Sequence, residues 1–298
     1  QDVLKLDILG HSDPTQLRMI QELTKTDILK VPLDDKETMS IFSSTDALGV
    51  TPEQINSKVG SYGIPEFGTK FVRGMLVDTK PTTFDELIRI SGLSHGTDVW
   101  LGNAQSLIEE GTVTLNEAIC CRDDIMIYLM KQGLEPNPAF KIMETVRKGK
   151  ALKDPAKWAE YVAMMKEHNV PDWYIKSCEK IKYMFPKAHA AAYVMMAWRI
   201  AYCKVFYPLA YYAAYFSIRA TAFSYELMCQ GKDKLEGYMH EYEKRKDELS
   251  KKEQDTYKDM RLVQEMYARG FEFLPLDIYK SEPHHFQIVD GKLLPALN

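Results

Sequence analysis

Apolar and polar residues alternate at the start of the chain and then recur at helical spacing. Residues 3–9 place Lys5 and Asp7 between apolar neighbours, and residues two apart share one face of an extended strand. From residue 13 to about residue 225 the spacing changes to that of α-helices. The pattern therefore predicts one β-strand followed by a long helical region.

Capping residues mark where helices of this region begin. A polar capping side chain stands before a proline or an acidic first turn at four positions: Asp13, Thr51, Thr83 and Asp154. Residues 172–185 repeat apolar side chains at helical spacing, which predicts a helix. Pro186 fits the first turn of a further helix that continues to residue 207.

The end of the chain changes character twice. Residues 231–262 are dense in Lys, Glu and Asp, which predicts a solvated helix or helical hairpin. Residues 271–274 and 285–289 are strand-like, and Asp290–Gly291 is a typical hairpin turn. The predicted fold class is mainly α, with one strand before the helices and a small β-hairpin segment after them.

Composition excludes several classes of protein. The 298 residues are 45% hydrophobic and 27% charged with a net charge of −4, so the chain is neither disordered nor a polycationic nucleic-acid coat. The most apolar stretch, residues 190–216, is interrupted by Arg199, Lys204 and Pro208, which predicts buried helices and no membrane span. Five cysteines without a C-x-x-C pair indicate a reducing, cytoplasmic setting. The phosphate-binding and hydrolase signatures GxxxxGK[ST], GxGxxG, GxSxG and HExxH are absent.

Lys5 and Asp7 are the first candidate functional residues. On a strand they project from the same face, where a carboxylate can bind Mg²⁺ and a lysine can steady a phosphate. The alternative is a surface lysine–aspartate pair on an edge strand, which is common and contributes little.

Two basic positions of the helical region have the same ambiguity. Residues 140–150 form a helix that ends in Arg147, Lys148 and Lys150 before and after a glycine. Such cations contact a triphosphate or a DNA backbone, or they offset the helix dipole without any ligand. Arg122 opens another helix, and either of the two aspartates that follow it could neutralise it.

His189 and Tyr193 are four residues apart and share a helix face that is otherwise padded with alanine. Such a face suits a base or a sugar, although a histidine and a tyrosine buried in the core would give the same spacing. Residues 91–98 form a small, polar loop that includes Ser94, His95 and Gly96, and its backbone can approach a ligand closely. These three residues are a candidate nucleotide-pocket loop.

In their order along the chain, these segments resemble the PolC type of bacterial DNA polymerase III alpha subunits. The matching segments are distributed along nearly the whole chain up to residue 215: LKLDILGH (4–11), IFSS (41–44), ALGV (47–50), GIPEFGT (63–69), GLSHGTDVWLGN (92–103), CRDDI (121–125), VRKGK (146–150) and YMFPKAHAAAY (183–193).

The resemblance implies a C-family replicative DNA polymerase that transfers nucleotides from dNTPs to a primer 3′-hydroxyl with two Mg²⁺ ions. It implies that residues 1–11 are the last strand of the palm, 12–230 the helical fingers, 231–270 a charged helical region and 271–298 a β segment that leads towards a helix–hairpin–helix region. Primer–template DNA, the incoming dNTP, a sliding clamp and other replisome subunits are the implied partners. The implied location is the bacterial cytoplasm, at the nucleoid.

The resemblance also implies roles for the candidate residues. Asp7 corresponds to the third carboxylate of a catalytic triad that binds two Mg²⁺ ions, and Lys5 to a contact with the incoming triphosphate. Because the other two carboxylates would lie upstream, this segment alone is expected to be inactive. Arg122, Arg147 and Lys148 correspond to the phosphate-neutralising pocket of the fingers.

By the same resemblance His189 and Tyr193 face the nascent base pair. The segment Ser94, His95 and Gly96 lies where the other branch of the family has an arginine–proline–glycine loop, and this sequence departs from that pattern. Two further interpretations remain open from the residues. One is a non-catalytic helical module that binds nucleic acid or protein, and the other is a paralogue that has kept the fingers but lost catalysis.

Overall fold

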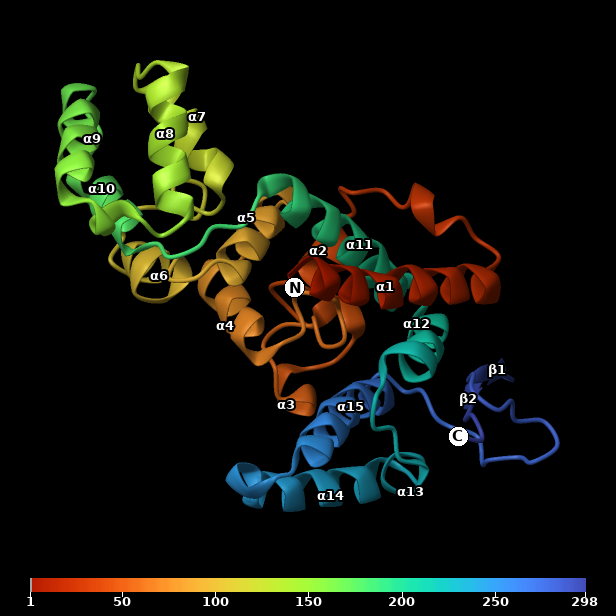
Figure 1. Ribbon diagram of the computed structural model, residues 1–298. Helices are drawn as coiled ribbons and strands as arrows, with labels where there is room; N and C mark the ends of the chain where they lie inside the picture. The colour runs from red at the N-terminus through yellow and green to blue at the C-terminus, as the bar shows by residue number, and fades with distance from the viewer. Residues whose placement is uncertain (1) are drawn as a thin grey trace. The chain divides into compact units, whose positions relative to one another are not determined.

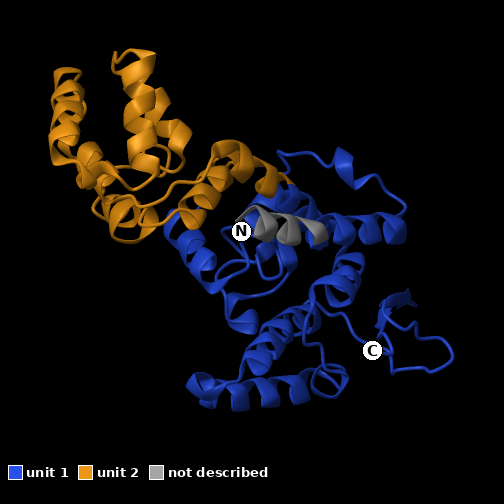
Figure 2. Cartoon of the chain, viewed as in Figure 1, with its two compact units in different colours: residues 1–80, 196–298 blue, residues 81–195 orange. Residues whose placement is uncertain are grey.

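The computed structural model describes the backbone of residues 2–298 and the side chains from residue 12 onward, and it is mainly helical as predicted (Figure 1). Two compact units divide the chain (Figure 2). Unit 1 comprises residues 1–80 and 196–298, and unit 2 comprises residues 81–195. No helix in the described part of the chain is long and apolar enough to cross a bilayer.

Unit 1 takes its elements from both ends of the chain. They are α1 Asp2–Thr24, α2 Lys36–Ser40, α3 Pro52–Ile55, α4 Lys70–Thr79, α12 Pro208–Ala214, α13 Tyr225–Met228, α14 Lys232–Lys244, α15 Lys251–Ala268, β1 Gln287–Val289 and β2 Lys292–Leu294. Unit 2 contains α5 Phe84–His95, α6 Gln105–Glu109, α7 Arg122–Lys131, α8 Pro136–Arg147, α9 Pro155–Glu167 and α10 Asp172–Lys180. The helix α11, Lys187–Phe206, begins in unit 2 and ends in unit 1.

Most of the predicted helix starts are confirmed by hydrogen bonds. The Thr51 hydroxyl accepts from the Gln54 amide at the start of α3, and the Thr83 hydroxyl accepts from the Glu86 amide at the start of α5. The Asp154 carboxylate accepts from an amide in the first turn of α9. Each cap satisfies a donor that the helix leaves unpaired, which is why these sequence positions define helix ends.

The first element differs from the prediction. Residues 3–9 were expected to form a strand and Asp13 to cap a helix, but α1 runs continuously over Asp2–Thr24 with Pro14 inside it. A strand needs a hydrogen-bonded neighbour, and none pairs with this segment in the described chain, whereas a helix pairs its backbone groups internally. Asp13 does not cap a helix, since its carboxylate forms an ion pair with Arg219. The side chains of Lys5 and Asp7 lie outside the described residues.

A second prediction fails at the end of α10. The helix expected over residues 172–185 stops at Lys180, and Ile181 has extended dihedral angles (φ −70°, ψ 131°). Proline at position 186 disfavours a helical conformation for Phe185, which explains why the apolar spacing does not continue as a helix. Residues 181–186 form an extended segment, called the linking segment below.

The end of the chain matches the prediction in part: residues 271–274 contribute only an isolated bridge at Phe273, and much of α15 is buried. The charged region forms the adjacent helices α14 and α15, and Ser250 and Glu253 make a reciprocal capping box at the start of α15. Strands β1 and β2 pair antiparallel, and the turn residues Asp290 and Gly291 both have positive φ, as a two-residue hairpin turn requires.

Unit 1 has a charged pair inside its core. The Lys204 ammonium lies 2.7 Å from Oε1 of Glu265, and both side chains are fully buried. The same ammonium donates to the carbonyl oxygens of Gly60 and Tyr62 at 2.8 and 2.7 Å, and the Tyr212 hydroxyl donates to Glu265 at 2.6 Å. These bonds fix the loop at residues 60–62 against α11 and α15.

Candidate functional site

The linking segment ties together separate parts of unit 2. The amide of Thr97, just after α5, donates to the carbonyl of Tyr183 at 2.9 Å, and the amide of Lys182 donates to the carbonyl of Thr97 at 3.0 Å. The amide of Met184 donates to the carbonyl of Arg147 at the end of α8. The amide of Arg122, at the start of α7, donates to the carbonyl of Phe185. Backbone hydrogen bonds thus bring the segments that contain Thr97, Arg122 and Arg147 together at the linking segment.

Aromatic rings pack around Phe185 of the linking segment. The His95 ring stacks on Phe185 with centroids 4.7 Å apart, and it lies 6.0 Å from the Tyr193 ring. Phe185 also lies 5.9 Å from His189 and 6.2 Å from Tyr193. The structure therefore brings together His95, His189 and Tyr193, which were predicted separately, around a phenylalanine that is buried.

The first turns of α11 present a smooth, accessible face beside these rings. His189 is exposed, Tyr193 is half-buried, and the exposed neighbours Ala188 and Ala192 carry only methyl groups. Of the alternatives left by the sequence, the buried core histidine is wrong, because His189 is open to solvent. A flat ligand can approach this face without displacing a large side chain.

Arg147 and Lys148 share one carboxylate. Nε and Nη2 of Arg147 donate to the two oxygens of Glu144, the second at 2.9 Å, and the Lys148 ammonium lies 3.3 Å from the same carboxylate. Hydrogen bonding from Arg147 lowers the pKa of Glu144 to about 2, and hydrogen bonding to Glu144 raises the pKa of Arg147. The pair leaves a net positive charge at the end of α8, with Lys148 exposed.

Gly149 allows the basic end of α8 to lie close to the linking segment. Its φ is +70°, and a Cβ there would lie 2.5 Å from the carbonyl oxygen of Lys182. Only glycine permits both the backbone conformation and the close approach. The chain therefore places Arg147 directly against the linking segment, beside Tyr183.

Arg122 carries a positive charge that neither of the two following aspartates neutralises. Asp123 accepts from the Lys187 amide at 2.9 Å, which caps α11, and Asp124 accepts from the amides of the two residues before Arg122 and pairs with Arg89. Neither aspartate neutralises Arg122, contrary to one of the two alternatives. Within the described part of the chain, the half-buried Arg122 guanidinium makes no ion pair or hydrogen bond.

The predicted loop at residues 91–98 is largely helical. Helix α5 continues to His95, and the Ser94 hydroxyl donates to the carbonyl of Ser91 within that helix. The helix persists through Gly92 because this glycine packs against the next segment, where a Cβ would lie 2.4 Å from Sγ of Cys121. Gly96 ends the helix. The Ser94 hydroxyl is used within the helix, and of the three residues His95 is the one that stacks on Phe185.

Sequence reasoning missed three residues that organise the site: Phe185, Glu144 and Asp123. Phe185 was assigned to a helical apolar stripe, and its position directly before a proline was the signal for an extended residue. Glu144 lies three residues before Arg147, the spacing of a helical ion pair. Asp123 acts through a contact with Lys187 that no local pattern indicates.

Metal ligation by this chain alone is not supported by the side chains that the structure describes. From residue 12 onward no three His, Cys, Asp or Glu side chains gather at metal-binding distance. These residues do not fit a Mg²⁺ centre, and Asp7, the predicted ligand, is outside the described side chains.

A sequence model of the bacterial DNA polymerase III alpha subunit finger domain matches residues 13–169. The match covers more than half of the chain, and the chain belongs to this family. This result confirms the predicted resemblance to a polymerase fingers region.

Relatives named DNA polymerase III PolC-type align with nearly the whole chain. The relative from Caldanaerobacter subterraneus subsp. tengcongensis is 54% identical over 99% of this chain and 21% of its own length. Those from Oceanobacillus iheyensis and Clostridium perfringens are each 56% identical, over 100% and 99% of this chain and 20% of their own length. The chain thus spans about a fifth of the length of these curated relatives.

Proposed function

We propose that this chain is the fingers region of a bacterial replicative DNA polymerase and that unit 2 binds the incoming dNTP and the nascent base pair. The observation that carries the proposal is the convergence on the linking segment of two cationic helix ends, at Arg122 and Arg147, with an aromatic, methyl-padded helix face. A nucleotide needs this combination, because its phosphates are anionic and its base is flat.

Each part of the site has a separate task in this proposal. Arg122, which has no carboxylate partner, and Arg147, with Lys148 beside it, neutralise the triphosphate. The exposed His189 and half-buried Tyr193 contact the base pair that forms, and the small side chains of α11 leave room for it. Glu144 holds the Arg147 fork in place until the triphosphate competes for its donors.

Lys5 and Asp7 complete the proposal in the longer polypeptide. We propose that Asp7 supplies one of the carboxylates of a two-metal Mg²⁺ centre and that Lys5 contacts the triphosphate, when neighbouring palm strands pair with residues 1–11. Bound Mg²⁺ would activate the primer hydroxyl and stabilise the departing pyrophosphate. One carboxylate does not hold two metals, so we expect this segment alone to be inactive.

The remaining assignments follow the polymerase interpretation. We propose residues 12–230 as fingers, 231–270 as a charged helical region and 271–298 as a segment leading to further domains. Primer–template DNA is the proposed macromolecular partner, with a sliding clamp and other replisome subunits bound mostly through other parts of the polypeptide. The proposed location is the cytoplasm, at the nucleoid.

Primer extension with Asp7→Asn tests the proposal. The full-length polypeptide is assayed with Mg²⁺ and four dNTPs, beside Asp78→Asn as a matched substitution in α4. Asp7→Asn is expected to abolish extension while primer–template affinity stays unchanged, because asparagine keeps the shape but loses the charge that a metal requires. Asp78→Asn is expected to extend normally.

Equal extension by the parent and Asp7→Asn would contradict the catalytic role. In that case the chain would be better described as a helical module that binds nucleic acid or protein without a catalytic role.

A further inference from the structure

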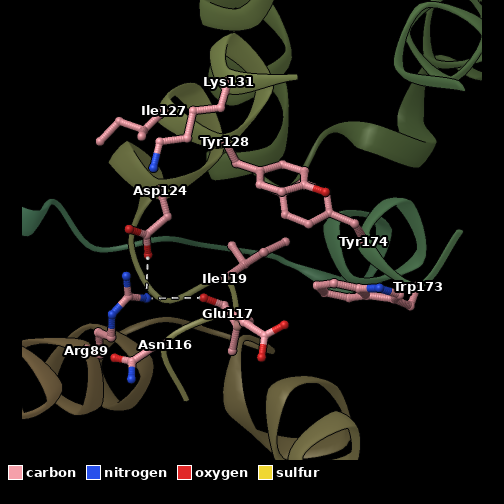
Figure 3. A pocket seen from close by; sticks show the side chains of 11 residues that line it. Arg89, Asn116, Glu117, Ile119, Asp124, Ile127, Tyr128, Lys131, Trp173 and Tyr174 are labelled. Atoms are coloured by element: carbon pink, nitrogen blue, oxygen red, sulfur yellow. Dashed lines mark hydrogen bonds and ion pairs between the residues drawn. The ribbon is translucent and has the colours of Figure 1, made fainter. Parts of the chain in front are cut away.

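A cavity of about 310 Å³ lies in unit 2 beside the face of α7 that carries Asp124 (Figure 3). It is bounded by α7, by residues 116–119 and by the start of α10. Ligand pockets in proteins begin at about this size. The nucleotide site proposed above uses none of the side chains that line this cavity.

One face of α7 forms a wall of the cavity. Asp124, Ile127, Tyr128 and Lys131 are spaced at i, i+3, i+4 and i+7, which puts them on one side of the helix. Ile125 and Leu129, between them, are buried. The wall therefore combines an acidic, an apolar, an aromatic and a basic side chain in a row.

Two basic side chains, Arg89 and Lys131, and two acidic ones, Asp124 and Glu117, line the cavity. Arg89 lies 3.8 Å from Asp124 and bonds to a backbone carbonyl (Figure 3). Glu117 accepts from the amide and hydroxyl of Thr114, which are neutral donors, so no cation among the described residues neutralises its carboxylate. Lys131 is exposed, and among the residues that the structure describes it has no acidic partner. In Figure 3 its amine lies on the side of Ile127 and Asp124, across the view from Trp173. An anionic group entering the cavity meets a free ammonium.

The opposite wall is aromatic. The Trp173 indole lines the cavity and is half-buried, whereas the chain's other tryptophans, Trp100, Trp158 and Trp198, are buried. Beside it the rings of Tyr128 and Tyr174 stack with centroids 4.2 Å apart. The Tyr174 hydroxyl is buried, and it has no hydrogen-bond partner in the described chain. The cavity thus has an aromatic stacking surface on this wall.

We propose that this cavity binds one nucleotide, with the base stacked on Trp173 and a phosphate on Lys131. Aromatic platforms flanked by cations bind single nucleotides in this manner without strong sequence preference. The nucleotide comes either from an unpaired template strand or from free solution, and the chemistry of the cavity is the same for both. The template source rests on the proposed polymerase function, whereas the free-nucleotide source does not.

The test compares Trp173→Ala and Lys131→Gln in the full-length polypeptide with Lys141→Gln, which removes an exposed lysine from α8. Binding of primer–template DNA is measured by fluorescence anisotropy with a long single-stranded 5′ template overhang and with a blunt end. Binding of free dTMP is measured by calorimetry. For the template source, we expect each cavity variant to lose about ten-fold or more in affinity for the overhang DNA only.

Lys131→Gln should also lower the salt dependence of overhang binding, by about one phosphate contact. Loss of dTMP affinity with unchanged overhang affinity would assign the cavity to a free nucleotide. Unchanged affinity for both ligands in both variants overturns the proposal. If circular dichroism shows that Trp173→Ala is unfolded, the exposed Lys131→Gln decides the outcome alone.

Primer extension separates this proposal from the proposed function. On a template with a short overhang, the cavity variants should extend at the parent rate. Loss of extension in Asp7→Asn, with unchanged affinity for both the overhang DNA and dTMP in the cavity variants, would leave the polymerase interpretation standing and reject the cavity site.

Discussion

Both units contain a cation paired with a glutamate, and the two pairs differ in what surrounds them. In unit 1, Lys204 and Glu265 are fully buried, and the Lys204 ammonium is saturated by Glu265 and two carbonyls. In unit 2, the side chains of Arg147 and Glu144 are 26% and 23% exposed. The guanidinium there is held at one edge, and water or a ligand can reach it. The pairing of a cation with a glutamate therefore holds core elements together in unit 1, whereas in unit 2 it leaves the cation accessible to solvent.

The pKa values reflect the same difference. Burial lowers the pKa of Lys204 to about 8, although Glu265 opposes that shift. At the open pair, hydrogen bonding from Arg147 lowers the pKa of Glu144 to about 2. Desolvation dominates in the core, and hydrogen bonding dominates at the surface. The surface pair is thus ionised across the whole physiological range.

The largest expected effect comes from breaking the buried pair. Lys204→Met removes the cation that neutralises the Glu265 carboxylate and the ammonium that donates to the carbonyls of Gly60 and Tyr62. We expect a loss of about 3–5 kcal/mol in the local free energy of opening, because an uncompensated buried charge is strongly unfavourable. Native-state hydrogen exchange of the α12 and α15 amides in the full-length polypeptide measures it. Lys252→Met, at an exposed position of α15, is the matched control, and equal protection in both variants would contradict the account.

A second effect in unit 1 depends on pH. Burial raises the pKa of Asp259 from 3.8 to about 6, so the folded state retains a proton that the unfolded state loses. Stability is therefore expected to fall as pH rises from about 4 to about 6, by at most about 3 kcal/mol, because one pKa unit corresponds to about 1.4 kcal/mol. Hydrogen exchange of α15 amides over this range checks the slope.

Asp259→Asn should remove that slope, since asparagine does not titrate. The exposed Asp247→Asn should keep it. A slope that survives in Asp259→Asn would show that another group causes the pH dependence.

In unit 2 the expected effects are on ligand binding, and stability is expected to stay the same. Arg122→Gln removes a guanidinium that no carboxylate in the described chain neutralises. We expect the KM for dNTP to rise about 10- to 100-fold, as for the loss of a charged hydrogen bond worth about 1.5–3 kcal/mol. Steady-state primer extension measures KM, and thermal unfolding should be unchanged. A large fall in stability with an unchanged KM would make Arg122 a structural residue.

The smallest effect is expected for Lys148→Gln. Its side chain is 47% exposed, and its ammonium already shares Glu144 with Arg147. Exposed ion pairs contribute about 0–1 kcal/mol, so the KM for dNTP should change by less than about five-fold. A change as large as that of Arg122→Gln would assign Lys148 an equal part in phosphate binding.

Local sequence signals predicted the elements whose ends are capped locally. Thr51, Thr83 and Asp154 begin helices because each side chain accepts a hydrogen bond from the amide three residues further along. The same local view failed for residues 3–9 and 181–186. The conformation of a strand-like segment depends on its hydrogen-bonding partner, and the partner of residues 181–186, Thr97, is distant in sequence.

The site shows the same limit. The shared face of His189 and Tyr193 follows from helical spacing alone and was predicted. That Asp123 caps α11 while Arg122 stays unpaired depends on the contact with Lys187, far along the chain. Sequence spacing therefore found the candidate cations, but it did not show which of them is available to a ligand.

The most direct test of the central claim is the dNTP affinity of Arg147→Gln in the full-length polypeptide, compared with Lys141→Gln on the same helix. Single-turnover primer extension at varied dNTP concentration gives this affinity, and anisotropy gives the affinity for primer–template DNA. The account predicts about 10- to 100-fold weaker dNTP binding for Arg147→Gln, parent-like dNTP binding for Lys141→Gln and unchanged DNA affinity for both. Unchanged dNTP binding with weakened DNA affinity in Arg147→Gln would contradict the claim that unit 2 binds the triphosphate.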